Sequence, residues 1–256
     1  MNWKTFYALL SRDGHVARRN LLPMLLQNLL QPLLFTFIFG RVMTTSGIMP
    51  ASYKNMLLPG IMAISMVMSG VWAVAMPLIS EFQFTREIED RLLAPIEIGW
   101  LAVQKVVTGM IQALVAGLVV LPAAWLVMGA GVSPSLGHLL EMLLIALLVA
   151  LFSAAGGLAL GCSIGQTQVG LMFSLVLAPM MMFGCAYYPW QALDPFPVLK
   201  YAVLINPLVY ASEGLRGALV PSVPHINTLL VIAVLAVIDF SLLYLGLRKF
   251  HSKALS

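Results

Sequence analysis

The stretch EFQFTREIEDRLLAPIEIGW, residues 81–100, decides how this chain is laid out. It holds seven charged side chains between Glu81 and Glu97, although only 9% of the 256 residues are charged. The runs on either side, residues 56–80 and 106–140, contain no charged side chain. A short charged segment between two long apolar runs is expected to lie in water at a membrane surface.

The charged stretch also has a helical pattern. Phe84, Ile88 and Leu92 recur at intervals of four residues, which places them on one face of a helix. Pro95 interrupts that pattern, because proline lacks the backbone N–H and clashes with the preceding turn. We therefore expect an amphipathic helix over residues 84–94, with one face available to another protein.

The composition indicates an integral membrane protein. Hydrophobic residues make up 61% of the chain and the mean hydropathy is +0.95, whereas soluble domains are about 45–50% apolar and about 25% charged. The net charge of +4 lies mostly at the ends of apolar runs, which favours membrane topology over a nucleic-acid partner. Cys162 and Cys185 both lie in apolar sequence and are interpreted as small buried hydrophobic residues.

The apolar runs predict an all-α membrane protein with six spans in a single transmembrane domain over residues 21–256. Glu141 and Asp194 bracket 52 residues without a charge, about 78 Å of helix, so this run must fold back once. The polar stretch 161–170 marks the turn. The expected spans are 21–39, 56–80, 101–128, 139–160, 169–186 and 226–247.

Two further segments are not expected to span the membrane. Residues 1–20 alternate aromatic and aliphatic side chains with basic ones and predict an interfacial amphipathic helix. Residues 187–225 contain six prolines but are also apolar in parts. Such a segment is too broken to span and too apolar to be free in water, so we expect re-entrant short helices.

The distribution of lysine and arginine predicts the orientation. With six spans, both termini and residues 81–100 share one side of the membrane. That side carries ten of the 14 basic residues and the other side carries four. The positive-inside rule therefore predicts cytoplasmic N- and C-termini.

Catalytic and nucleotide-binding patterns are absent from the sequence. There is no G-x-x-x-x-G-K-[ST] motif to hold a nucleotide phosphate, and the four histidines are scattered near the ends of apolar runs. We therefore expect no enzyme activity, no metal and no cofactor on this chain. Any ATP that drives it would be bound by a separate protein.

Two features inside the spans have alternative interpretations. Gly157, Gly161 and Gly165 repeat every four residues after Ser153, which favours close backbone packing. The sequence leaves open whether that packing is within one subunit or across a dimer. Asp239 lies near the middle of the sixth expected span, where a charge is costly. It is either a polar point on a transport pathway or a protonated or hydrogen-bonded acid within the helix bundle.

The chain resembles the type-2 ABC exporter permeases over essentially its whole length. The resemblance rests on the six-span pattern, the interfacial N-terminal helix, and two motifs: TREIEDRLLAPI at residues 85–96 and NPLVYASEGLRGAL at residues 206–219. Daunorubicin-exporter-like permeases and nodulation lipo-oligosaccharide-export permeases share this size and layout.

The resemblance implies roles for both motifs. In such permeases the cytoplasmic helix between spans two and three docks on the ATPase. The candidate contacts here are Arg86, Glu87, Glu89, Asp90 and Arg91.

The second motif would belong to an outer re-entrant element that closes the exit or only anchors a hairpin. Its candidate residues are Asn206, Pro207, Tyr210, Glu213 and Arg216. The resemblance also implies two permease copies, expected as a homodimer, and two ATP-binding subunits carrying ATP and Mg²⁺.

The expected function is the membrane subunit of an ATP-driven exporter in a bacterial inner membrane. Few charges in the spans favour a hydrophobic or amphiphilic substrate, such as a drug, lipid or glycolipid. Export of a polysaccharide or lipo-oligosaccharide is the alternative within this class. A membrane-embedded enzyme and a membrane scaffold that transports nothing are the alternatives outside it.

Overall fold

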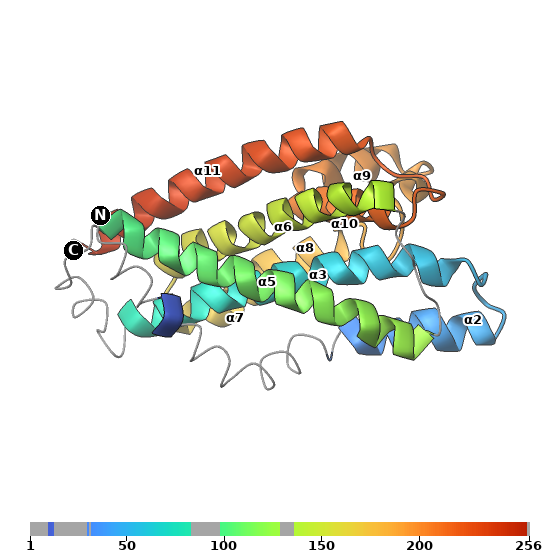
Figure 1. Ribbon diagram of the computed structural model, residues 1–256, viewed down its shortest axis with the longest axis horizontal. Coiled ribbons are helices and arrows are strands. Elements are labelled where there is room, and N and C mark those ends of the chain that lie inside the picture. Colours follow the sequence, from blue (N-terminus) through green and yellow to red (C-terminus); the bar gives the residue numbers. More distant parts are fainter. Residues whose placement is uncertain (1–9, 13–29, 31, 83–97, 129–135, 255–256) are drawn as a thin grey trace.

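The computed structural model describes residues 10–12, 30, 32–82, 98–128 and 136–254. Four long apolar helices run side by side along the molecule (Figure 1). They are α3 (Tyr53–Ser80), α5 (Ile98–Met128), α6 (Leu136–Ser163) and α11 (Thr228–Ala254). Each is about 40 Å long or more, enough to cross a hydrocarbon core of about 30 Å. The prediction of a helical membrane protein is confirmed.

Helix α3 forms the centre of the bundle. Every residue from Leu57 to Val71 is buried, and α3 packs against α5, α6 and the shorter helix α10 (Pro207–Leu219). A helix that is apolar on all sides is expected to be surrounded by other helices. The charged stretch that follows α3 therefore begins at the most enclosed helix of the bundle.

The small residues of α6 allow α3 to approach closely. A methyl group added at Gly157 would lie 2.8 Å from the carbonyl oxygen of Val71, and one at Gly161 would lie 3.0 Å from Cα of Ala75. Side chains at these positions would collide with the backbone of α3. Of the two packing alternatives, the structure places Gly157 and Gly161 in a contact within one chain.

Two other apolar helices are described over shorter stretches of the chain. The helix from Pro32 to Thr45 includes the π-helix η1 (Thr36–Val42) and α2 (Met43–Thr45). The helix from Val169 to Met182 comprises α7 (Val169–Met172), the π-helix η4 (Phe173–Leu177) and α8 (Ala178–Met182), after the short η3 (Gln166–Gln168). At 14 residues, the second of these is about 21 Å long.

The chain turns back immediately after α8. The N–H of Phe183 bonds to the carbonyl of Pro179, and Cys185 has a φ of 51°, a left-handed conformation that is uncommon for a residue with a side chain. The expected span at 169–186 therefore ends as a helix at Met182. Its last four residues form the entrance to the re-entrant segment.

The re-entrant segment is built from short helices. They are η5 (Trp190–Leu193), α9 (Pro197–Ala202), η6 (Val203–Ile205) and α10. Every residue of α10 from Leu208 to Leu219 is buried, and α10 packs against α3, α6 and α11. The segment therefore inserts a helix into the bundle and does not only cover its end.

The remaining helix ends differ from the expected spans by a few residues. The run expected at 21–39 continues as helix to Thr45, so the connection to α3 covers residues 46–52, whereas the expected spans left residues 40–55 between them. Helices α5, α6 and α11 are longer than the runs 101–128, 139–160 and 226–247. Hydropathy marks where a helix meets water, whereas polar helix formers such as Arg248 and Lys249 continue the hydrogen-bond ladder beyond that point.

Two expected elements fall largely or wholly outside the described residues. Of the interfacial helix at residues 1–20, the structure describes Leu10, Ser11 and Arg12, which are helical. The amphipathic helix expected at 84–94 lies entirely outside. It stays a prediction.

Candidate functional site: the re-entrant helix and its anchors

Helix α10 begins at a residue pair that specifies a helix start. Asn206 is the N-cap, and its Oδ1 accepts a hydrogen bond from the N–H of Leu208 at 3.0 Å. Pro207 occupies the first helical position, where its missing N–H costs nothing. The Nδ2 of Asn206 also donates to the carbonyl of Met180 at 2.7 Å. One side chain therefore caps α10 and ties it to α8.

The first turns of α10 hold two segments that precede it in the chain. Tyr210 donates its hydroxyl to the carbonyl of Leu204 at 2.9 Å, and Ser212 donates to the carbonyl of Gly184 at 2.6 Å. Both acceptors are main-chain groups that no helix ladder satisfies. The side chains of α10 thus donate the hydrogen bonds that water would otherwise donate to the carbonyl groups of these turns.

Glu213 and Arg216 form a fully buried ion pair one turn further along. Both side chains are 0% exposed, and Nη1 of Arg216 bonds to Oε1 of Glu213. Glu213 also accepts the N–H of Trp190 at 2.9 Å and the N–H of Ile226 at 3.1 Å. Nη2 of Arg216 donates to the carbonyl of Cys185 at 2.8 Å.

We call this pair and its three main-chain partners the anchor cluster. It joins the turn after α8, the start of η5, the segment before α11 and α10 itself. Desolvation by burial lowers the pKa of Arg216, and the charge of Glu213 opposes that shift. A buried ion pair is tolerated where hydrogen bonds satisfy its remaining lone pairs and protons. Both carboxylate oxygens are satisfied here, whereas Nε of Arg216 has no hydrogen-bond partner among the described residues.

Helix α3 meets the same turn from the other side. A methyl group added at Gly60 would lie 1.8 Å from the carbonyl oxygen of Ala186. Near the start of α3, Tyr53 donates its hydroxyl to the carbonyl of Tyr187 at 2.7 Å. The turn after α8 is therefore held between α3 and the anchor cluster.

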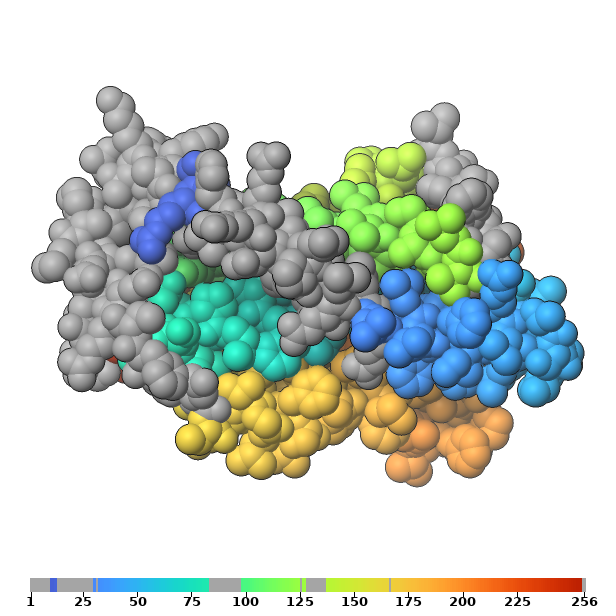
Figure 2. Space-filling view, turned by 90° about the horizontal axis from the view of Figure 1, so that it is seen from below, coloured from blue at the N-terminus to red at the C-terminus, as the bar shows by residue number. Residues whose placement is uncertain are grey.

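An open apolar groove lies beside the anchor cluster, between α8 and the re-entrant helices. Its volume is about 550 Å³. Among the described residues that line it, none is charged and Asn206 is the one polar residue; the others include Leu175, Met180, Phe183 and Ala202. Figure 2 shows the helix from 169 to 182 in yellow and the re-entrant segment in orange along one edge of the molecule. We call this the α8–α9 groove.

Asp239 lies away from this groove. It is 1% exposed, and neither carboxylate oxygen has a hydrogen-bond partner among the described residues. It belongs to the buried stripe of α11, with Val231, Leu235, Gly246 and Phe250, and α11 packs chiefly on α6. The two roles considered for Asp239 stay predictions.

The charged stretch begins with a second buried ion pair at the opposite end of the bundle. Nζ of Lys105 on α5 lies 2.6 Å from Oε1 of Glu81, which directly follows α3, and the two side chains are 5% and 8% exposed. The candidate ATPase contacts lie outside the described residues: Arg86, Glu87, Glu89, Asp90 and Arg91.

Comparison with known families agrees with the motifs. The profile of the ABC-2 type transporter family matches residues 5–220, which include both motifs and the anchor cluster as far as α10. The chain belongs to the ABC-2 type transporter family. A search of curated proteins found no match. As an ABC-2 protein, the chain is the membrane permease of an ABC transporter, a class that works with an ATP-binding subunit.

All five residues expected in the re-entrant element of this ABC-2 permease lie on α10 or at its N-cap, and Glu213 and Arg216 contact each other directly. The structure adds partners that the sequence did not indicate. Three of these partners are main-chain groups: the N–H groups of Trp190 and Ile226 and the carbonyl of Cys185. Any residue type could supply them, so the sequence does not reveal these contacts. Ser212 and Gly60 were also missed, although a serine inside a buried helix and a glycine inside a span are both signals of close contact.

Proposed function

We propose that this ABC-2 permease exports a hydrophobic or amphiphilic compound, with ATP and Mg²⁺ bound on two separate ATPase subunits. The α8–α9 groove supports this substrate class. It is open and apolar, and it carries no charge for an ionic substrate. Sites that bind such ligands are mostly apolar, with a few polar groups that fix orientation.

The proposed assembly is a homodimer in a bacterial inner membrane, with both termini in the cytoplasm. Ten of the 14 basic residues on the expected inner side support this orientation. The outward direction rests on the resemblance to exporter permeases. The two shorter apolar helices would complete six spans in each copy. The helix at 84–94 would contact the ATPase.

The α8–α9 groove suggests a direct test of the substrate class. The permease would be co-purified with its ATPase, reconstituted in vesicles, and assayed for ATP hydrolysis with added hydrophobic compounds. Ala202→Trp fills the groove with an indole ring and is expected to bring stimulated hydrolysis down to the basal rate. Leu229→Trp is the matched control, because Leu229 is 78% exposed at the start of α11 and does not line the groove.

The outcomes separate the alternatives. Absence of a co-purifying ATPase would contradict the exporter proposal and favour a scaffold. Stimulation by lipo-oligosaccharide but not by hydrophobic compounds would favour the alternative substrate. Equal stimulation in Ala202→Trp and Leu229→Trp would remove the groove from the substrate path.

A further inference from the structure

A second pocket lies at the end of the bundle where α5 is first described and α11 ends. Its volume is about 370 Å³. Its walls are apolar and include Ile98 and Val103 of α5 and Leu247 of α11. It is separate from the α8–α9 groove, which is lined by α8, α9 and the neighbouring residues.

The polar lining of this pocket is basic. Among the described residues that line it, Arg248, His251 and Tyr244 are the titratable ones, and none is acidic. Lys249 and Lys253 follow on the same helix, and α11 has no acidic residue after Asp239. The pocket therefore combines an apolar interior with a positively charged rim.

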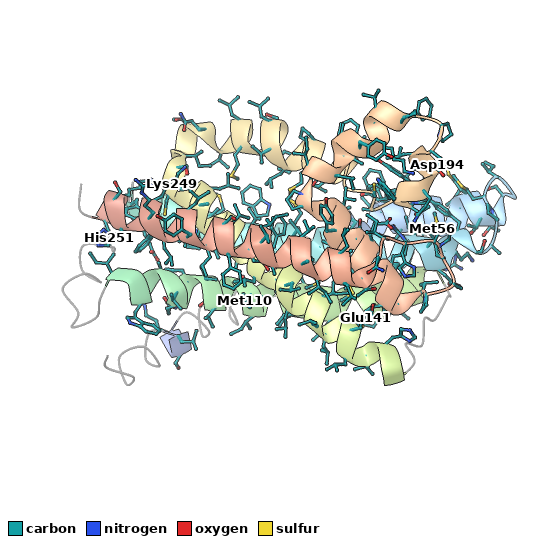
Figure 3. All side chains as sticks on the ribbon, turned by 90° about the horizontal axis from the view of Figure 1, so that it is seen from above. Met56, Met110, Glu141, Asp194, Lys249 and His251 are labelled. Atoms are coloured by element: carbon teal, nitrogen blue, oxygen red, sulfur yellow. The ribbon has the colours of Figure 1, made fainter. Side chains whose placement is uncertain are left out.

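The position along the helix matches the depth of lipid headgroups. The apolar run of α11 ends at Leu247, and the basic residues begin at Arg248. Trp100 and Tyr244 also line the pocket, and these two residue types concentrate where hydrocarbon meets headgroups. Figure 3 shows Lys249 and His251 at this end of α11, beside the described start of α5.

We propose that this pocket binds the headgroup of an anionic phospholipid. The guanidinium of Arg248 would pair with the phosphate, because its planar fork matches phosphate oxygens. The apolar walls would cover the first carbons of an acyl chain. Basic pockets between membrane helices are known to hold anionic headgroups in this way. A volume near the lower limit of ligand sites suits a headgroup better than a whole lipid.

The test uses the full-length chain in mild detergent, titrated with phosphatidylglycerol or phosphatidylcholine of identical acyl chains, with bound lipid measured by native mass spectrometry. Wild type is expected to prefer phosphatidylglycerol. Arg248→Gln is expected to weaken phosphatidylglycerol binding about tenfold, the loss of one charge-assisted hydrogen bond. Lys249→Gln removes the same charge from the adjacent position, which does not line the pocket, and is expected to bind as wild type does.

Several outcomes would overturn the proposal. Equal affinity for the two lipids would remove the anionic preference. Equal weakening by Arg248→Gln and Lys249→Gln would show a diffuse charge effect instead of a site. Soluble glycerol phosphate binding as tightly as the lipid would show a free phosphate site. His251→Gln provides a second lining variant, and thermal unfolding of each variant would verify that it is folded.

Discussion

At the scale of single residues, the anchor cluster concentrates several interactions on two side chains. Replacing Glu213 by Gln removes the charge that balances Arg216, and the new amide group would face one of the two N–H donors that the carboxylate now accepts. Breaking a buried ion pair from one side costs about 3–5 kcal/mol. Glu213→Gln is therefore expected to lower the free energy of unfolding by that amount, measured by thermal or chemical unfolding in detergent.

The re-entrant segment offers a matched exposed pair. Nζ of Lys200 lies 2.6 Å from Oδ1 of Asp194, but Asp194 is 62% exposed. Exposed pairs contribute less than about 1 kcal/mol, so Asp194→Asn is expected to change stability by no more than that. If the two variants lost equal stability, the anchor cluster would not have the structural importance that its burial indicates.

At the scale of elements, the contact between α3 and the turn after α8 requires a residue without a side chain at position 60, which is Gly60. Gly60→Ala would place a methyl group 1.8 Å from the carbonyl oxygen of Ala186, so a backbone must move. The expected loss is about 1–3 kcal/mol or more, measured by thermal unfolding. Gly137→Ala is the control, because nothing lies within 4 Å of the added atom. That substitution should be neutral or stabilise α6 by about 0.5–1 kcal/mol.

The four long helices could be predicted from the sequence, because exposing a long apolar run to water is costly whichever helices it packs against. The sequence did not locate the ends of the helices, since Arg248 and Lys249 continue a helix as well as leucine does. It also did not indicate how deeply α10 is buried. Glu213 and Arg216 stand three residues apart on a helix, so a pair between them could be predicted, and the structure shows it. The main-chain partners from distant segments, which allow this pair to be fully buried, could not be predicted.

At the scale of the whole molecule, α3 joins the two buried ion pairs. Its C-terminal end is followed by Glu81, which pairs with Lys105, and its N-terminal half contacts the turn that Arg216 holds. A helix packed on several sides moves largely as a rigid body. A displacement of the segment between α3 and α5 would therefore reach the anchor cluster along α3. The α8–α9 groove lies beside that cluster.

If α3 carries movement in this way, we expect the charged stretch to be the segment that contacts the ATPase. Reversing Glu87, Glu89 and Asp90 to lysine is expected to abolish co-purification of the ATPase, or to abolish substrate-stimulated ATP hydrolysis if the complex persists. The thermal stability of the permease should be unchanged, because the buried Glu81–Lys105 pair is left intact. Asp194→Lys reverses a charge on the re-entrant segment, at the opposite end of the bundle, and should leave assembly intact. Normal assembly and stimulation in the triple variant would place the docking surface elsewhere.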